Sequence, residues 1–304
     1  MKKKILLIGG PTAVGKTKLG ITCANVFDGE IISADCMQIY THLNIGTAKP
    51  TNEELSLAKH HLIDIKQPTE DFSAGEFKLI ASSLIEEITK KQKLPILVGG
   101  TGLYLKSLLY PYDFSNTTKN EQIRQKYKNL ASTFGNEYVF DILKKVDRVS
   151  ASKLHQNDIK RVIRALEIFD TTGKPMSQQQ NKVESIYDFK LIFLNDDREV
   201  LYNRINSRVD KMFEDGLEQE VLNVIKKFNL TKNNHSMQGI GYKEFFDYID
   251  GTITKQQLIE KIKQNSRNYA KRQITWFKHM QNVSEYNIND IDKILLDIKN
   301  WLNN

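Results

Sequence analysis

Cysteine is scarce in this chain, with Cys23 and Cys36 the two found among 304 residues. Their spacing fits neither a disulfide framework nor a zinc site, and the pair His60-His61 has no further ligands at a metal-site spacing. Long apolar runs are absent too, since none approaches the ~18 residues that a membrane span requires. Because thiols stay reduced inside cells, we expect a cytoplasmic protein with no membrane segment.

Acidic residues are outnumbered by basic ones. The chain has 44 Lys and Arg against 37 Asp and Glu, which gives a formal net charge of +7. This excess favours a polyanionic partner without requiring one. Hydrophobic residues make up 40% of the chain, enough to build a buried core. A length of 304 residues exceeds one typical domain and predicts a core with one or two appended units.

The N-terminal region contains the phosphate-loop pattern G-x-x-x-x-G-K-[ST] without a gap. The loop consists of Gly10, Pro11, Thr12, Ala13, Val14, Gly15, Lys16 and Thr17. An apolar run over 5–8 predicts a buried strand before it, and 18–26 predicts a helix after it. The N–H groups of such a loop face phosphate oxygens, Lys16 can neutralise their charge, and the Thr17 hydroxyl can bind Mg²⁺. The pattern therefore predicts a diphosphate or triphosphate site.

Two polar residues follow other predicted strands. Asp35 follows the strand 30–34, and Thr101 follows the strand 94–98, which ends in glycines rather than in the carboxylate typical of nucleotide hydrolases. Since the carboxyl ends of parallel strands share one edge of a sheet, both residues should lie near the phosphate loop. On local sequence alone, Asp35 could instead cap a helix or support a metal ligand, and Thr101 could cap a helix.

Strands and helical patterns alternate up to residue 111, as in a doubly wound α/β core. Within this part, 69–90 opens with turn residues and continues as an amphipathic helix, whose predicted core positions are Phe77, Ile80, Ala81, Leu84, Ile85 and Ile88. Residues 112–185 are helical and polar, and a strand returns at 190–194. We therefore expect an α/β fold with a parallel sheet, a P-loop NTPase-like core formed by 1–111 and 186–304, and a helical insertion domain over 112–185. Helical patterns at 198–213 and 256–280 make the C-terminal part mostly helical.

Basic residues cluster on predicted helices. In the insertion, Lys160, Arg161 and Arg164 share one side of a helix. In the helix predicted at 256–280, basic residues are interleaved with aromatic ones. Cations and rings in this arrangement suit a nucleic-acid surface, where they meet phosphates and bases. A solvated charged face and a buried aromatic stripe are the simpler alternatives.

Further motifs accompany the phosphate loop. They lie at 32–35 with Gln38 and Tyr40, and at 45–50, 61–64, 72–77, 97–104, 157–167, 241–242 and 270–276. In this order, over most of the chain, they resemble the bacterial tRNA dimethylallyltransferases, also called tRNA isopentenyltransferases. One departure is Cys36, where the family usually has Ser. A thiol is a weaker hydrogen-bond partner than a hydroxyl, so any polar role of that position is in question.

The resemblance implies transfer of a dimethylallyl group from dimethylallyl diphosphate to N6 of the adenine at position 37 of tRNA, beside the anticodon. It implies Mg²⁺ as cofactor, bound by Thr17, and a diphosphate held by the phosphate loop and Arg208. Asp35 would accept the proton of N6, and Thr101 would donate a hydrogen bond to the leaving oxygen. A leaving diphosphate would also explain why the strand at 94–98 ends without a carboxylate.

The resemblance further implies binding of the tRNA anticodon stem-loop by a monomer. The implied tRNA-binding residues are Asp35, Cys36, Met37, Gln38, Thr101, Arg124, Lys160, Arg161, Arg164, Gly241, Tyr242, Lys243, Lys271, Arg272 and Trp276. Among them, Gln38 is expected to hydrogen-bond the adenine after it flips out of its stack. Contacts of this kind with phosphates predict strongly salt-dependent binding.

Three other functions remain open at this point. The chain could be a small-molecule kinase that uses ATP, a prenyltransferase acting on free adenosine nucleotides, or an RNA-binding protein without activity. A free nucleotide needs neither the long helical insertion nor a basic C-terminal helix, which argues against the second. Loss of turnover with intact RNA binding in Asp35→Ala would reject the third.

Overall fold

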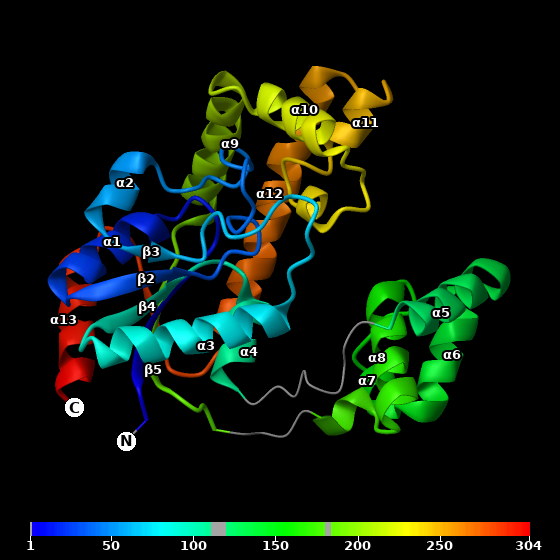
Figure 1. Ribbon diagram of the computed structural model, residues 1–304, viewed down its shortest axis with the longest axis horizontal. Coiled ribbons are helices and arrows are strands. Elements are labelled where there is room, and N and C mark those ends of the chain that lie inside the picture. The colour runs from blue at the N-terminus through cyan, green and yellow to red at the C-terminus, as the bar shows by residue number, and fades with distance from the viewer. Residues whose placement is uncertain (1, 111–119, 180–183) are drawn as a thin grey trace. The chain divides into compact units, whose positions relative to one another are not determined.

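The computed structural model describes residues 2–110, 120–179 and 184–304 (Figure 1). Within these residues, the chain forms a six-stranded sheet in the order β3-β2-β4-β1-β5-β6, with every pairing parallel. The strands are β1 (Lys4–Gly9), β2 (Gly29–Ser33), β3 (His60–His61), β4 (Leu94–Val98), β5 (Asp188–Leu194) and β6 (Val283–Tyr286). The four central strands are apolar, as a parallel sheet covered on both faces requires.

The chain divides into two compact units, 1–109 with 186–304, and 110–185. The first contains the sheet and the helices α1 (Lys16–Val26), α2 (Asn52–Leu57), α3 (Ala74–Lys90), α4 (Gly102–Leu109), α9 (Arg198–Glu214), α10 (Leu217–Phe228), α11 (Phe245–Ile249), α12 (Lys255–Lys278) and α13 (Ile291–Asn303). The second contains α5 (Glu121–Phe134), α6 (Asn136–Val146), α7 (Arg148–Ala151) and α8 (Ile159–Thr172). The predicted domain boundary at 111–112 lies outside the described residues.

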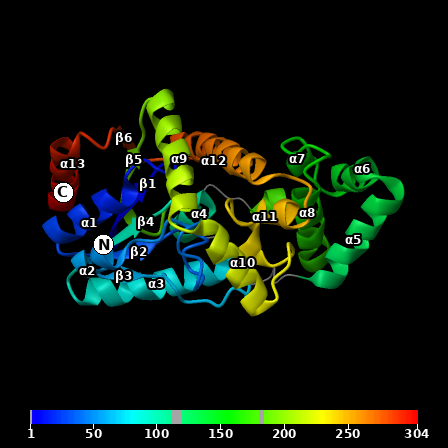
Figure 2. The same ribbon diagram turned by 90° about the horizontal axis from the view of Figure 1, so that it is seen from above.

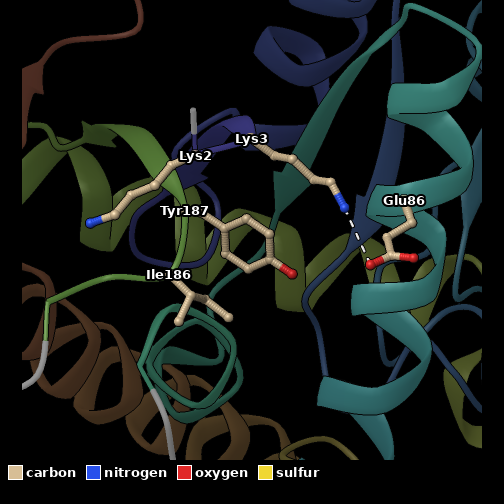
Figure 3. Close-up of a pocket in the computed structure, with 5 residues that line it drawn as sticks. All are labelled: Lys2, Lys3, Glu86, Ile186 and Tyr187. Atoms are coloured by element: carbon tan, nitrogen blue, oxygen red, sulfur yellow. Dashed lines mark hydrogen bonds and ion pairs between the residues drawn. The ribbon is translucent and has the colours of Figure 1, made fainter.

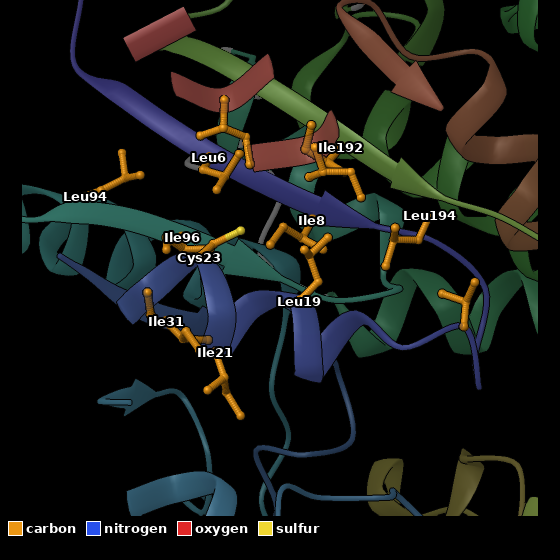
Figure 4. Close-up of a cluster of buried hydrophobic side chains, with 14 of the residues drawn as sticks. Leu6, Ile8, Leu19, Ile21, Cys23, Ile31, Leu94, Ile96, Ile192 and Leu194 are labelled. Atoms are coloured by element: carbon orange, nitrogen blue, oxygen red, sulfur yellow. The ribbon is translucent and has the colours of Figure 1, made fainter. Parts of the chain in front are cut away.

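Apolar side chains cover both faces of the sheet. On one face, Leu6 and Ile8 of β1 pack in a cluster with Leu19 of α1 (Figure 4). On the other face, the ring of Phe193 in β5 stacks on Phe277 of α12, with ring centroids 5.6 Å apart. Helix α12 begins beside α11 and ends against the sheet (Figure 2). Alternate strand residues point to opposite faces, so each strand joins two cores.

Most predicted elements of the first unit agree with the structure. The strands expected at 5–8, 30–34, 94–98 and 190–194 are confirmed as β1, β2, β4 and β5. The amphipathic helix expected within 69–90, after turn residues, is confirmed as α3, which begins at Ala74, where Ser73 and Glu76 form a capping box. Ile80, expected in the core, is instead 37% exposed. The two-residue strand β3 was not predicted, since its histidines carry no strand signal.

The second unit has a core of its own. Tyr127 of α5, Val139 of α6 and Val162 of α8 belong to one buried cluster. The helical character predicted for this segment is confirmed over 120–179. In neither unit, over the residues described, does a helix combine the length and apolarity needed to cross a membrane.

Candidate active site

The phosphate loop connects β1 to α1 at the carboxyl edge of the sheet. Gly10 and Gly15 both have positive φ, +149° and +101°. A Cβ at Gly10 would also collide with the backbone oxygen of Leu194, so the turn requires glycine there. Helix α1 begins at Lys16 with no side-chain cap. Its first N–H groups are therefore available to an anion.

Lys16 lies at the centre of the site. Its Nζ donates hydrogen bonds to the backbone oxygens of Gly10 (3.0 Å) and Pro11 (2.7 Å). Burial and the positive charge of Arg208, on α9, lower the pKa of Lys16 to about 7, while the carboxylate of Asp35 opposes this shift. Arg208 and Asp35 thus both lie close enough to Lys16 to influence its charge.

Asp35 and Thr101 follow neighbouring strands, because β2 pairs with β4. Burial raises the pKa of Asp35, although a hydrogen bond from Met37 N to its Oδ1 (2.9 Å) and the charge of Lys16 oppose the rise. Thr101 Oγ1 accepts a hydrogen bond from Cys36 N (3.1 Å), so its hydroxyl links the ends of the two strands. Burial, with a contribution from Asp35, raises the pKa of the Cys36 thiol to about 11, which keeps it neutral. The predicted convergence of these residues is confirmed.

Helix α12 packs against the loops of the site through glycines. Cβ atoms at Gly9, Gly100 and Gly102 would collide with Phe277, Gln273 and Trp276, respectively. These contacts require glycine because the helix comes closer than any side chain would permit. The indole of Trp276, predicted to bind tRNA, is thus packed partly against Gly102.

Gln273 and Tyr269 are site residues that the sequence did not place there, although Tyr269 is one of the aromatic residues interleaved with basic ones in the helix predicted at 256–280. Gln273 is 5% exposed; its Oε1 accepts from Thr12 N (3.0 Å) and its Nε2 donates to Gly100 O (3.1 Å). Tyr269 shares a hydrogen bond with the Thr101 hydroxyl. The two residues stand four apart, on one face of α12. This spacing, within a segment already noted for its motif, was the available signal.

The segment after Asp35 is anchored by α10. Glu220 accepts hydrogen bonds from Asn44 N (2.8 Å), Ile45 N (2.8 Å) and Gly46 N (3.2 Å). Tyr242 is fully buried, and its hydroxyl donates to Glu220 (2.7 Å). Its side chain therefore supports the segment through Glu220 and does not face solvent. Of the predicted tRNA contacts at 241–243, Lys243 is the exposed one, and Gly241 is buried.

The amide of Gln38 is held by the same segment. Gln38 Oε1 accepts from Ser33 Oγ (3.1 Å), and Nε2 donates to Thr47 O (3.4 Å) and Ala48 O (3.2 Å). Gln38 and Met37 are both half-buried. Both amide protons of Gln38 are engaged, so an adenine bound as predicted would donate to the second lone pair of Oε1 or displace a backbone partner of Nε2.

In the second unit, two of the predicted RNA-binding arginines hold a buried carboxylate. Arg124 Nε and Arg164 Nη1 donate to Glu167 at 2.9 and 2.7 Å, and Glu167 is 1% exposed. Burial opposes the ionisation of Glu167, but these hydrogen bonds outweigh it and lower its pKa below 4.5. Lys160 and Arg161, by contrast, are exposed. They are therefore the members of this set best placed to meet phosphates.

The basic side of α12 is partly neutralised. Lys261 pairs with Asp247 and Lys263 with Asp210, at 2.6 and 2.7 Å. The carboxylates come from α11 and α9, which the sequence pattern of one helix does not reveal. Lys271 and Arg272 are exposed at the end nearer the phosphate loop, where α12 carries Gln273. Fewer basic residues of α12 are thus available to the phosphates of a nucleic acid than the sequence predicts.

The site offers hard oxygen donors for a divalent cation. The Thr17 hydroxyl and the Asp35 carboxylate suit Mg²⁺, which prefers oxygen ligands and keeps several waters. Among the described residues, no cluster of three or more His, Cys, Asp or Glu could hold a metal by itself. An Mg²⁺ ion at this loop would take its remaining ligands from water or from phosphate oxygens.

A hollow of about 630 Å³ lies away from this site (Figure 3). It is lined by Lys2 and Lys3, just before β1, by Ile186 and Tyr187 at the approach to β5, and by Glu86 of α3. These residues stand at the amino ends of β1 and β5. In a parallel sheet ligands bind at the opposite, carboxyl ends, so the hollow is not part of the candidate site.

The chain is similar to known proteins over most of its length. The family model described as IPP transferase matches residues 38–280. A tRNA dimethylallyltransferase of Bacillus cytotoxicus is 48% identical over 294 residues, which are 96% of this chain and 92% of that protein. One from Thermoanaerobacter sp. (strain X514) is 46% identical over 295 residues, covering 95% and 93% of the two chains.

Solved structures are similar over nearly the whole chain. The tRNA isopentenylpyrophosphate transferase of Bacillus halodurans is 42% identical, with a TM-score of 0.73 and coverage of 99% of this chain and 96% of the other. A eukaryotic dimethylallyltransferase, described as acting on tRNA, is 31% identical with a TM-score of 0.79. The match covers 93% of this chain and 74% of the eukaryotic one.

Proposed function

The chain belongs to the IPP transferase family of tRNA dimethylallyltransferases, and we propose that it transfers a dimethylallyl group from dimethylallyl diphosphate to N6 of adenine 37 in tRNA. The product is N6-(dimethylallyl)adenosine. The observation that carries the proposal is the meeting of Lys16, Asp35 and Thr101 at one sheet edge. There β4 is followed by glycines and a threonine rather than by the carboxylate typical of nucleotide hydrolases. This suits a leaving diphosphate better than hydrolysis of a nucleotide.

The phosphate loop binds the diphosphate of the donor. Lys16 exchanges its contacts with the oxygens of Gly10 and Pro11 for phosphate oxygens, and Arg208 adds a second positive charge. An anion raises the pKa of Lys16 again and keeps the ammonium charged as the leaving group gains charge. Thr17 would supply a ligand to Mg²⁺, which when bound would neutralise charge on the diphosphate.

Asp35 acts on the acceptor. The allylic C–O bond breaks, its electron pair leaves with the diphosphate, and the N6 lone pair forms the new C–N bond. The extra proton on N6 passes to Asp35. Burial raises the pKa of this carboxyl, which makes it a better proton acceptor. Thr101 stands beside it to hydrogen-bond the leaving oxygen, held by Cys36 N and Tyr269.

The RNA is held by exposed cations on both units. Lys160 and Arg161 on α8, and Lys271 and Arg272 on α12, contact phosphates of the anticodon stem-loop. Arg124, Arg164, Met37, Gln38 and Lys243 complete the binding set, and the adenine leaves its stack to reach Asp35. The enzyme works as a monomer in the cytoplasm, where its tRNA substrate is found.

A transfer assay tests the proposal. Radiolabelled dimethylallyl diphosphate and Mg²⁺ are incubated with an unmodified anticodon stem-loop that carries adenine at position 37. A stem-loop with guanine at that position and free AMP serve as parallel acceptors. We expect label in the adenine-bearing RNA alone. Label in AMP would make the acceptor a free nucleotide, and absence of label with a protein that binds diphosphate would reject the transferase.

A further inference from the structure

A small cavity lies beneath the phosphate loop, on the α1 face of the sheet. Its volume is about 20 Å³, and its polar lining consists of Thr17, Ser33, Gln38 and His60. The strand register explains why Ser33 and His60 line the same cavity. Ile31 of β2 pairs with His60 of β3, and Ser33, two residues after Ile31, points to the same face of the sheet. The remaining lining is apolar. A cavity needs about 10–15 Å³ to hold one water molecule, so there is room for one.

His60 brings an unused acceptor to this cavity. Its Nδ1 lies 2.8 Å from the backbone oxygen of Ala58, and because a carbonyl only accepts, Nδ1 carries the proton. Nε2 then presents a lone pair. Burial also lowers the pKa of His60, which favours this neutral ring. Over the residues described, Nε2 is one of two buried side-chain polar atoms with no hydrogen-bond partner. Such an atom ordinarily has a partner, protein or water.

The neighbouring polar groups identify what could donate to Nε2. The Ser33 hydroxyl proton goes to Gln38 Oε1, and the Gln38 amide protons go to the oxygens of Thr47 and Ala48. These side chains offer acceptor lone pairs but no free proton. A water molecule, however, can donate to His60 Nε2 and to Ser33 Oγ while it accepts from Thr17. Three hydrogen bonds are typical of a buried water.

We propose that the cavity holds one ordered water that links the Thr17 hydroxyl to His60 Nε2, and that His60 is thereby a positioning residue for the diphosphate site. With its proton donated to the water, the Thr17 oxygen would keep a lone pair available to Mg²⁺. The inference rests on the proposed function, since it assumes a Mg²⁺-diphosphate at the loop. His60 itself touches neither donor nor RNA.

Calorimetric binding of inorganic diphosphate at several Mg²⁺ concentrations tests the link in the full chain. Removing a group that orients a metal ligand typically weakens metal binding 10–100-fold. Because a water intervenes, we expect His60→Leu to weaken Mg²⁺-dependent diphosphate binding about tenfold. His60→Gln, which keeps an acceptor oxygen near the position of Nε2, should recover most of the loss. His155→Leu, the same exchange at an exposed site in the other unit, should bind like the wild type.

A double-mutant cycle with Thr17→Val separates positioning from general damage. If His60 acts through Thr17, the double variant binds no more weakly than Thr17→Val alone. Losses that multiply, or wild-type affinity in His60→Leu, would overturn the inference while leaving the proposed function intact. A wild type that binds no diphosphate with Mg²⁺ would overturn both.

A crystal structure near 1.5 Å resolution gives a readout that needs no variant. We expect density for one water within hydrogen-bond distance of His60 Nε2 and Thr17 Oγ1. A well-ordered cavity without that density would reject the proposal, even if a His60 variant failed to fold.

Discussion

Asp35 has a role at the residue scale that a substitution of one atom can test. Asparagine keeps the shape of the side chain but cannot take the N6 proton. Since a general base contributes about 10²–10⁴-fold, we expect Asp35→Asn to lower kcat by that factor and to leave tRNA affinity within about threefold. Single-turnover kinetics and filter binding measure the two. Asp28→Asn, at an exposed site before β2, is the control, and an Asp35→Asn enzyme with wild-type turnover would refute the assignment.

Cys36 stands where the family resemblance leads us to expect serine. Its pKa of about 11 keeps the thiol neutral, and its backbone N–H, which an exchange of the side chain leaves in place, donates to Thr101 Oγ1. The substitution Cys36→Ser should therefore change kcat/KM by less than about tenfold, or roughly 1.4 kcal/mol. Steady-state kinetics with the stem-loop substrate decide this. A larger change would assign the sulfur a role of its own.

The positions of site residues next to strand ends could be predicted from the sequence. The residues that hold the neighbouring segments by hydrogen bonds could not. Asp35 and Thr101 follow apolar strands, so the rule for parallel sheets places them. Glu220, by contrast, holds a segment that lies 174–176 positions earlier in the chain, and no local pattern connects the two. The burial of Tyr242 has the same origin.

At the scale of elements, α12 is the brace of the phosphate loop. Replacing Gln273 by leucine removes the partners of Thr12 N and Gly100 O. A buried polar group left unpaired costs about 1–3 kcal/mol, so we expect the free energy of unfolding to fall by that amount. The KM for dimethylallyl diphosphate should rise about tenfold. Gln264→Leu, on the exposed side of the same helix, should change neither. An unchanged KM in Gln273→Leu would mean that the loop keeps its shape unaided.

Elements with strong periodicity were predictable, and their ends depended on individual caps. The helix at 74–90 shows its apolar period clearly, but the capping box of Ser73 and Glu76 rather than the period fixes its first residue. Strand β3 has two residues and no apolar alternation, so its place beside β2 follows from pairing alone. The ion pairs of α12 come from α9 and α11, and only the fold brings them together.

At the scale of the whole molecule, stability of the helical unit should depend on Glu167. Its pKa is lowered in the fold, so its stabilising effect is complete above pH 4.5 and is lost as pH falls through the folded value. We expect Glu167→Gln to lower the free energy of unfolding of this unit by about 2 kcal/mol at pH 7. The difference from wild type should shrink below pH 4.5. Urea unfolding at both pH values measures it, and a difference that did not depend on pH would exclude an ionic role.

The two units should contribute separately to the affinity for RNA. Each phosphate contact adds about 0.7–0.9 to the slope of log K against log salt. Exchanging both Lys160 and Arg161 for alanine should therefore reduce that slope by about 1.5 and weaken tRNA binding, with kcat at saturating RNA unchanged. Filter binding across salt concentrations tests this. Lys126 and Lys128, on α5, provide a control pair of equal charge, and an unaltered slope in the α8 variant would remove those residues from the interface.

The brace between Thr12 and Gln273 also has a consequence in time. The two residues are 261 positions apart. At about 5–20 residues per second, a ribosome needs roughly 13–50 s to reach Gln273 after Thr12 has been made. Throughout that interval α12 is not complete, so it cannot pack against Gly9 at the start of the loop region. The phosphate loop, among the first segments to be synthesised, is thus among the last to be completed.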